Sequence, residues 1–145
     1  MQQQQQQRKQ AVRQTATHTC LIVEDSEFDS LRMTRVLNRS LGPVDVKVAA
    51  TLEHAREMLQ TNQIGLILLD NNLPDGLGAN FALELAQNSR LAQIPVIMVS
   101  DWPSPFMWEK AASAGVLFVV NKTEFNGRYV HAALKTARDR RLRLN

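Results

Sequence analysis

The chain has 145 residues, a formal net charge of +3 and a hydrophobic content of 44%, so it has room for one domain with a real apolar core. Its single cysteine, Cys20, excludes an internal disulfide framework and a cysteine-based zinc site, and we expect it to be a small buried hydrophobe. No apolar run approaches the ~20 residues that a membrane-spanning helix needs, and the glutamine-rich start does not match a secretory signal. We therefore expect a cytoplasmic protein with no membrane partner.

Residues 1–18 are predicted to form a disordered tail, because this glutamine-rich segment cannot bury enough apolar surface to offset the entropy of ordering it. Residues 19–145 are predicted to form a single domain with no effector domain after it.

Apolar runs alternate with helical patterns along this domain. The predicted strands span residues 20–23, 44–48, 64–69, 95–99 and 116–120. The predicted helices begin at the capping residues Ser26 and Thr51, near Ala79, at Ser104-Pro105 and between Glu124 and Asn126, and the last of them ends at Arg141. Residues 71–78 are predicted to form a loop with a turn at Pro74 to Gly76. Five strand–helix repeats predict an α/β fold, a doubly wound parallel sheet with helices on both faces. The unbroken apolar run of residues 64–69 indicates a strand buried on both faces at the centre of that sheet.

Polar residues follow four of the five apolar runs within one or two positions. Glu24 and Asp25 follow the first, Asp70 the third, Ser100 the fourth and Lys122 the fifth. Ligands of open parallel sheets bind beyond the carboxyl ends of the strands, so we expect these groups to converge. Carboxylates suit a hard cation such as Mg²⁺, an aspartate can act as an oxygen nucleophile toward phosphorus, and lysine and serine can stabilise a phosphoryl group. Each of these residues alone could instead be a cap or a solvated charge.

Four segments together resemble the receiver domain of bacterial two-component response regulators, of the chemotaxis type, over roughly residues 19–141. They are Leu21 to Ser26, Leu68 to Gly76, Pro95 to Ser100, and Ala114 to Lys122. The resemblance implies a flavodoxin-like sheet of five parallel strands in the order 2-1-3-4-5 with five helices. It also implies a cytoplasmic phosphorelay signalling protein that is not an enzyme.

The resemblance further implies roles for the site residues. Asp70 matches the phosphoacceptor, Asp25 a direct Mg²⁺ ligand and Glu24 the acidic neighbour that acts through water. Ser100 and Lys122 match the hydroxyl and the lysine that contact the phosphoryl group, and the backbone carbonyl of Asn72 matches a further metal ligand. A histidine kinase or a histidine phosphotransfer protein is the expected donor.

Three positions depart from the family pattern. Val119 stands where the family has an aromatic switch residue, Asp101 where it has a small residue, and Thr123 where it has a proline. A phosphorylation-independent pseudo-receiver that acts as a protein-interaction module is therefore an alternative. A hydrolase of the aspartyl-phosphate type is a weaker alternative, because residues 24–27 lack the spacing of a nucleophile and a second aspartate two residues later.

The output of such a domain would be a downstream protein partner or a phosphorelay. Helical spacing cannot place all of Trp102, Phe106, Met107 and Trp108 inward, which predicts a partner surface or a homodimer through the fourth and fifth helices. Local packing of the two tryptophans over their loop is the alternative. The C-terminus is basic, with Lys135, Arg138, Arg140, Arg141 and Arg143. A solvated helix end accounts for these charges better than nucleic-acid binding does.

Overall fold

A five-stranded parallel sheet forms the centre of the molecule, and the computed structural model describes residues 19–144. The strands are β1 (Thr19–Val23), β2 (Asp45–Ala49), β3 (Ile64–Leu69), β6 (Val96–Ser100) and β7 (Phe118–Asn121). The helices are α2 (Glu27–Leu41), α3 (Leu52–Thr61), α4 (Gly78–Ala86), α5 (Pro105–Ser113) and α6 (Gly127–Leu144). The spatial order β2-β1-β3-β6-β7 confirms the predicted order of the five main strands.

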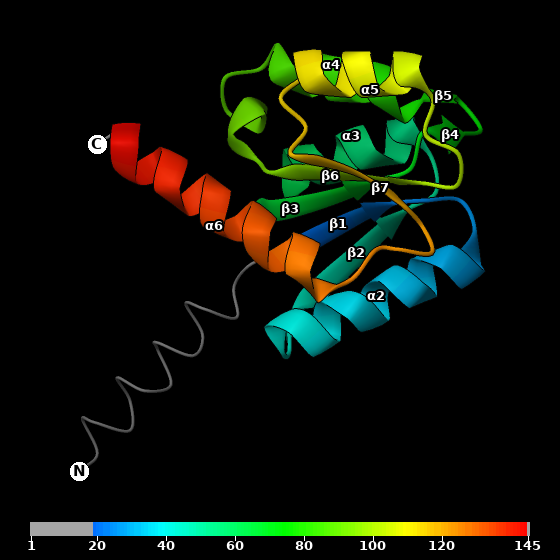
Figure 1. Cartoon of the computed structure of the whole chain (residues 1–145), viewed down its shortest axis with the longest axis horizontal. Helices are drawn as coiled ribbons and strands as arrows, with labels where there is room; N and C mark the ends of the chain where they lie inside the picture. The colour runs from blue at the N-terminus through cyan, green and yellow to red at the C-terminus, as the bar shows by residue number, and fades with distance from the viewer. Residues whose placement is uncertain (1–18, 145) are drawn as a thin grey trace.

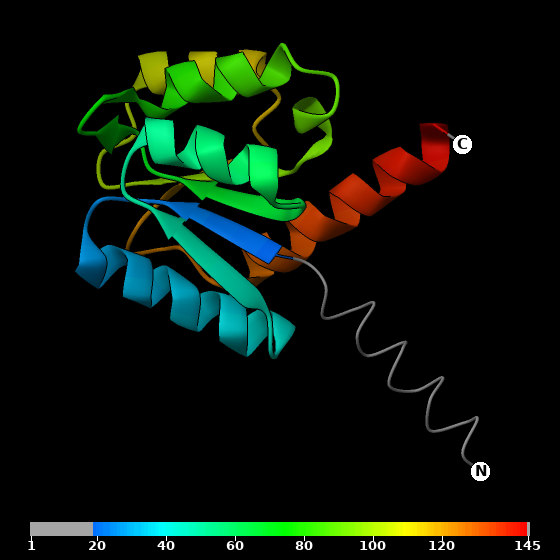
Figure 2. The same ribbon diagram turned by 180° about the vertical axis from the view of Figure 1, so that it is seen from behind.

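Helices cover both faces of the sheet (Figure 1), and each face has its own apolar core. Helices α3, α4 and α5 lie on one face, while α2 and α6 lie on the other, as the view from behind also shows (Figure 2). β3 is buried along nearly its whole length, as the unbroken apolar run predicted. Cys20 on β1 is fully buried in the core, as expected, and this burial raises the pKa of its thiol to about 11.

The predicted helix starts are confirmed by their capping hydrogen bonds. The Ser26 hydroxyl accepts from the backbone N–H of Asp29 at 3.3 Å, and Thr51 accepts from that of His54 at 3.1 Å. Ser104 likewise accepts from the third residue of α5, and Pro105 occupies the first turn, where its missing N–H costs no hydrogen bond. These contacts are local, which is why the sequence reveals them.

The boundaries of several segments differ from the prediction. The segment 71–78, predicted as a loop, contains the two-residue strands β4 (Asn72–Leu73) and β5 (Gly76–Leu77), which pair around Pro74 and Asp75. The last strand begins at Phe118 rather than at Val116, because the N–H of Val116 still donates to the Ala111 carbonyl and closes the end of α5. Helix α6 continues beyond the predicted end at Arg141.

A further short segment, η1 (Leu91–Gln93), is a single 3₁₀ turn between α4 and β6. Within residues 19–144, no helix is long and apolar enough to cross a bilayer. The prediction of a disordered tail concerns residues 1–18, which lie outside the described part of the chain.

Candidate functional site

Strand register brings the predicted site residues to one edge of the sheet. Val23 pairs with Leu69 across β1 and β3, and the N–H of Asp70 donates to the Val23 carbonyl at 3.0 Å, so the acidic residues that follow both strands become neighbours. On the other side, the last residue of β6, Ser100, pairs with Asn121 of β7, and the N–H of Lys122 donates to the Ser100 carbonyl at 3.1 Å.

Three carboxylates lie close together at this edge of the sheet. Glu24, Asp25 and Asp70 each offer one oxygen, and these oxygens lie within 4.8 Å of one another. Glu24 and Asp70 are 1% and 5% exposed, whereas Asp25 is open to solvent. Such a cluster, buried on one side and open on the other, is an arrangement that a hydrated divalent cation can enter.

The carboxylate of Glu24 fits a cation site for a second reason. Its Oε2 atom is buried and has no hydrogen-bond partner, although such groups are nearly always paired. Burial, together with the neighbouring Asp70 carboxylate, raises the pKa of Glu24 to about 9 even though the Lys122 ammonium opposes this change. The oxygen-only donor set and the unpaired oxygen both suit a hard cation such as Mg²⁺.

The Lys122 ammonium lies among four carboxylates. Its Nζ atom is 2.7 Å from Glu24 Oε1 and 2.9 Å from Asp29 Oδ2. Asp70 Oδ2 and Asp101 Oδ2 are farther away, at 3.6 and 3.8 Å. Burial is the largest single influence and lowers the pKa of Lys122, but the hydrogen bonds to the acids outweigh it and raise the pKa above its usual value. Lysine is therefore held as a cation at this edge.

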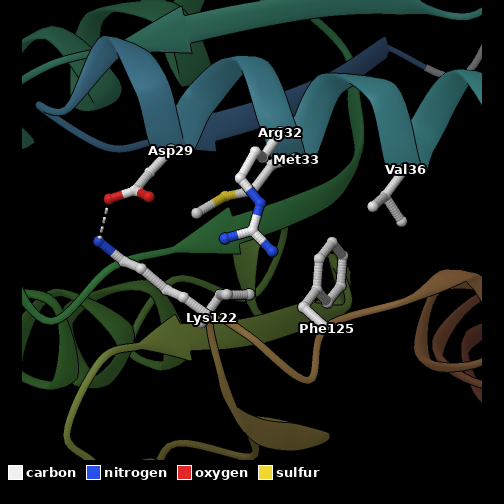
Figure 3. Close-up of a pocket in the computed structure, with 7 residues that line it drawn as sticks. Asp29, Arg32, Met33, Val36, Lys122 and Phe125 are labelled. Carbon is white, nitrogen blue, oxygen red and sulfur yellow. Dashed lines mark hydrogen bonds and ion pairs between the residues drawn. The ribbon is translucent and has the colours of Figure 1, made fainter.

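The contact with Asp29 could not be assigned from the sequence alone. Asp29 is the third residue of α2, and it was interpretable only as a first-turn acid near a helix N-terminus. In the structure its carboxylate reaches across to Lys122, as Figure 3 shows, and this hydrogen bond lowers the pKa of Asp29. The signal in the sequence is its position in the first turn of the helix that directly follows Glu24 and Asp25, which places it near the same edge of the sheet.

The backbone that follows Asp70 is held in place by hydrogen bonds and by a close contact with Gly78. The N–H of Asn71 donates to Asp70 Oδ1 at 2.8 Å, and the Asn71 side chain accepts from the N–H of Ala79 at 3.0 Å, at the start of α4. Gly78 packs so tightly here that a Cβ atom would lie 2.0 Å from the Asp70 carbonyl oxygen. Asn72, whose carbonyl the resemblance assigned to the metal, begins β4 directly after this turn.

Residues Ser100 and Asp101 follow β6 and differ in their surroundings. Ser100 is buried, and its carbonyl receives the Lys122 N–H. The Asp101 side chain is exposed and lies at ion-pair distance from the Lys122 ammonium, so its charge is partly matched.

Aromatic side chains lie on the surface next to this edge. Trp102 is 89% exposed, and Phe106 and Trp108 are also exposed, whereas Met107 is buried in the core. The alternative in which the tryptophans pack over their own loop is therefore wrong for Trp102. Val119, in the position of the family's aromatic switch, is half-buried and lines a surface hollow with Trp108 and Tyr129.

The acidic cluster and the lysine lie beyond the carboxyl ends of the strands of a doubly wound sheet, which is where proteins of this fold class bind their ligands. A sequence model described as the response regulator receiver domain matches residues 20–135. The chain thus belongs to the response regulator receiver family, whose domains are signalling modules of two-component systems.

Individual relatives agree with this assignment. The chain is similar to the transcriptional regulatory protein DpiA of Escherichia coli (strain K12), with 41% identity over 73 residues, which are 50% of this chain and 32% of DpiA. The aligned region thus spans about a third of that relative.

Two solved structures also match. A CheY-like receiver domain protein from Methanospirillum hungatei JF-1 has a TM-score of 0.73 and 21% identity, covering 88% of this chain and 98% of that one. The Mn(2+)-bound form of response regulator Rcp1 has a TM-score of 0.67 and 25% identity, covering 83% of this chain and 88% of that one.

Proposed function

We propose that the chain is a two-component receiver that accepts a phosphoryl group on Asp70 in a Mg²⁺-dependent reaction in the cytoplasm. The observation that carries this proposal is the convergence of three carboxylate oxygens within 4.8 Å of one another, with the Lys122 ammonium 3.6 Å from Asp70 Oδ2. A phosphohistidine on a histidine kinase or a phosphotransfer protein is the donor that suits this chemistry.

The metal would be held by Glu24, Asp25 and Asp70, with the backbone carbonyl of Asn72 as a further ligand. It would supply positive charge to the carboxylates and to the phosphoryl oxygens. The unpaired Oε2 of buried Glu24 supports this ligand set. The manganese in the Rcp1 structure supports a divalent cation in a related receiver.

Asp70, Lys122 and Ser100 have separate roles in the proposed phosphoryl transfer. A carboxylate oxygen of Asp70 attacks phosphorus, so that an O–P bond forms while the P–N bond to the donor histidine breaks and the imidazole takes up a proton. The Lys122 ammonium then neutralises phosphoryl charge, and the Ser100 hydroxyl donates to a phosphoryl oxygen. The product is an acyl phosphate on Asp70.

The output is proposed to be binding of a downstream protein or onward phosphorelay. The exposed aromatic side chains of Trp102, Phe106 and Trp108, in and just before α5, support a protein partner, since large aromatic residues are enriched at interfaces. A homodimer through α5 and α6, the fourth and fifth predicted helices, is a second use of this surface.

Acetyl phosphate with Mg²⁺ tests the proposal. We expect one phosphoryl group per chain by intact-mass spectrometry and none in Asp70→Asn. Asp139→Asn, which changes an exposed aspartate on α6, should be phosphorylated like the wild type. A wild-type chain that neither becomes phosphorylated nor binds beryllofluoride at millimolar Mg²⁺ would rule the function out.

A further inference from the structure

The position of the Lys122 ammonium is the starting observation. Its two shortest contacts are hydrogen bonds to Glu24 and Asp29, at 2.7 and 2.9 Å. The proposed phosphoacceptor Asp70 is beyond hydrogen-bond distance, at 3.6 Å. A lysine ammonium has three donors, so two of them are committed to acids other than the proposed acceptor.

We propose that Asp29 is a positioning residue that holds the Lys122 ammonium away from Asp70 in the resting protein, and that it thereby limits how readily Asp70 is phosphorylated. This inference rests on the proposed function of Asp70, and it concerns a residue outside the carboxylate cluster.

The carboxylate of Asp29 is free to take this role. The N-terminal cap of α2 is the hydroxyl of Ser26, which accepts the backbone N–H of Asp29, so the cap does not use the Asp29 carboxylate. The first turn of a helix also favours a negative charge. With its side chain only 20% exposed, the carboxylate meets the ammonium where water screens the pair weakly.

Phosphorylation of Asp70 would change the competition for Lys122. A phosphoryl group brings about −1.5 to −2 charge and three strong acceptor oxygens. Lys122 must then move from Asp29 toward those oxygens, and the hydrogen bond with Asp29 opposes this movement. The negative charge of Asp29 also repels the incoming group. Both effects act in the same direction, against phosphorylation.

A second cation lies where it can replace Lys122. Arg32 follows Asp29 by three residues on α2, a spacing that places the two side chains on one face of the helix. Both line the pocket that also contains Lys122, and Figure 3 shows the Arg32 guanidinium extending toward Lys122 and Phe125. Arg32 can therefore pair with Asp29 once Lys122 has moved, so that the Asp29 carboxylate still has a cationic partner.

Asp29→Asn tests this inference, with Glu27→Gln as the matched control. Glu27 is an exposed acid in the same first turn of α2, and it has no hydrogen bond or ion pair with Lys122. With acetyl phosphate and Mg²⁺, we expect Asp29→Asn to be phosphorylated about fivefold faster than the wild type and to bind beryllofluoride more tightly by a similar factor, equivalent to about 1 kcal/mol. Glu27→Gln should stay within about 1.5-fold of the wild type because exposed charges are strongly screened.

The outcomes separate the two proposals. A wild-type chain that is not phosphorylated contradicts the proposed function. A phosphorylated wild type with Asp29→Asn equal or slower contradicts the role of Asp29, and so do equal effects of Asp29→Asn and Glu27→Gln.

A readout without phosphoryl chemistry completes the test. The NMR signal of the Lys122 ammonium should shift in Asp29→Asn and stay in place in Glu27→Gln. An unshifted signal in Asp29→Asn would show that Asp29 does not hold the ammonium, whatever the phosphorylation rates are.

Discussion

Gly78 sits where the chain has no room for a side chain, and Gly78→Ala is therefore expected to damage both the fold and the site. The added methyl group would lie 2.0 Å from the Asp70 carbonyl oxygen and 2.9 Å from its carbon, whereas ordinary contact begins at 3.4 Å. The atoms in the way are backbone, so no side-chain rotation can relieve the overlap.

The surrounding hydrogen bonds fix both sides of this contact. The N–H of Asp70 donates to Val23 in the neighbouring strand, and the N–H of Gly78 donates to the Asn71 carbonyl at 2.7 Å. Moving either side breaks one of these bonds. Overpacking typically costs 1–3 kcal/mol and a broken hydrogen bond adds to it, so we expect the free energy of unfolding to fall by about 3 kcal/mol.

Urea denaturation followed by circular dichroism measures this loss. Gly115→Ala is the control, because Gly115 has a φ of +76° at the end of α5 but nothing within 4 Å of an added Cβ atom. It should lower the free energy of unfolding by only about 1 kcal/mol, the usual cost of a non-glycine residue in the left-handed region. The steric argument would be refuted by a Gly78→Ala protein that is as stable as the wild type or more stable than Gly115→Ala. In the phosphorylation assay, Gly78→Ala should also react more slowly, because Asp70 itself must shift.

Three further predictions follow from the structure. Mg²⁺ should raise the melting temperature of the wild type by binding only the folded chain, and Asp25→Asn should remove most of this increase in a thermal-shift titration. Trp102→Ala should leave the free energy of unfolding within about 0.5 kcal/mol of the wild type, whereas Met107→Ala in the same region should lower it by about 2–4 kcal/mol, because only Met107 is buried. Asp75 caps α3, because its carboxylate accepts from the first two N–H groups of the helix, and these hydrogen bonds lower the pKa of Asp75. The carboxylate therefore contributes to the free energy of unfolding above its unfolded pKa of about 3.9, and this contribution is lost as the pH falls through the lower pKa of the folded state. The urea midpoints of wild type and Asp75→Ala should accordingly differ at pH 7 and converge near pH 2, and a difference that grew on acidification would contradict the cap.

The carboxylate of Asp75 makes contacts that the local sequence could not reveal, although the turn around it is predicted correctly. The sequence indicates a turn at Pro74 to Gly76, and the structure has one. The use of the Asp75 carboxylate is not local, because it accepts from the N–H groups of Leu52 and Glu53, more than twenty residues earlier. The sequence assigned that helix start to Thr51 alone, whereas both side chains cap it.

The sequence by itself determined the elements and the edge at which the polar groups meet. Apolar runs that end in Glu24, Asp70, Ser100 and Lys122 define strands whose carboxyl ends share one side of a parallel sheet. The reason is that hydrophobic periodicity and capping are properties of a few consecutive residues. The family resemblance then added the strand order, which local patterns cannot provide.

Only the tertiary structure decided which acids hold the lysine. Four carboxylates lie within 4 Å of the Lys122 ammonium, and their ranking depends on differences of about 1 Å between side chains from four separate segments. Such differences arise from the packing of α2 against the sheet and from the register of β7 beside β6. Charge interactions between part-buried groups vary steeply over that range, so the preference for Asp29 over Asp70 follows from the folded geometry rather than from any sequence pattern.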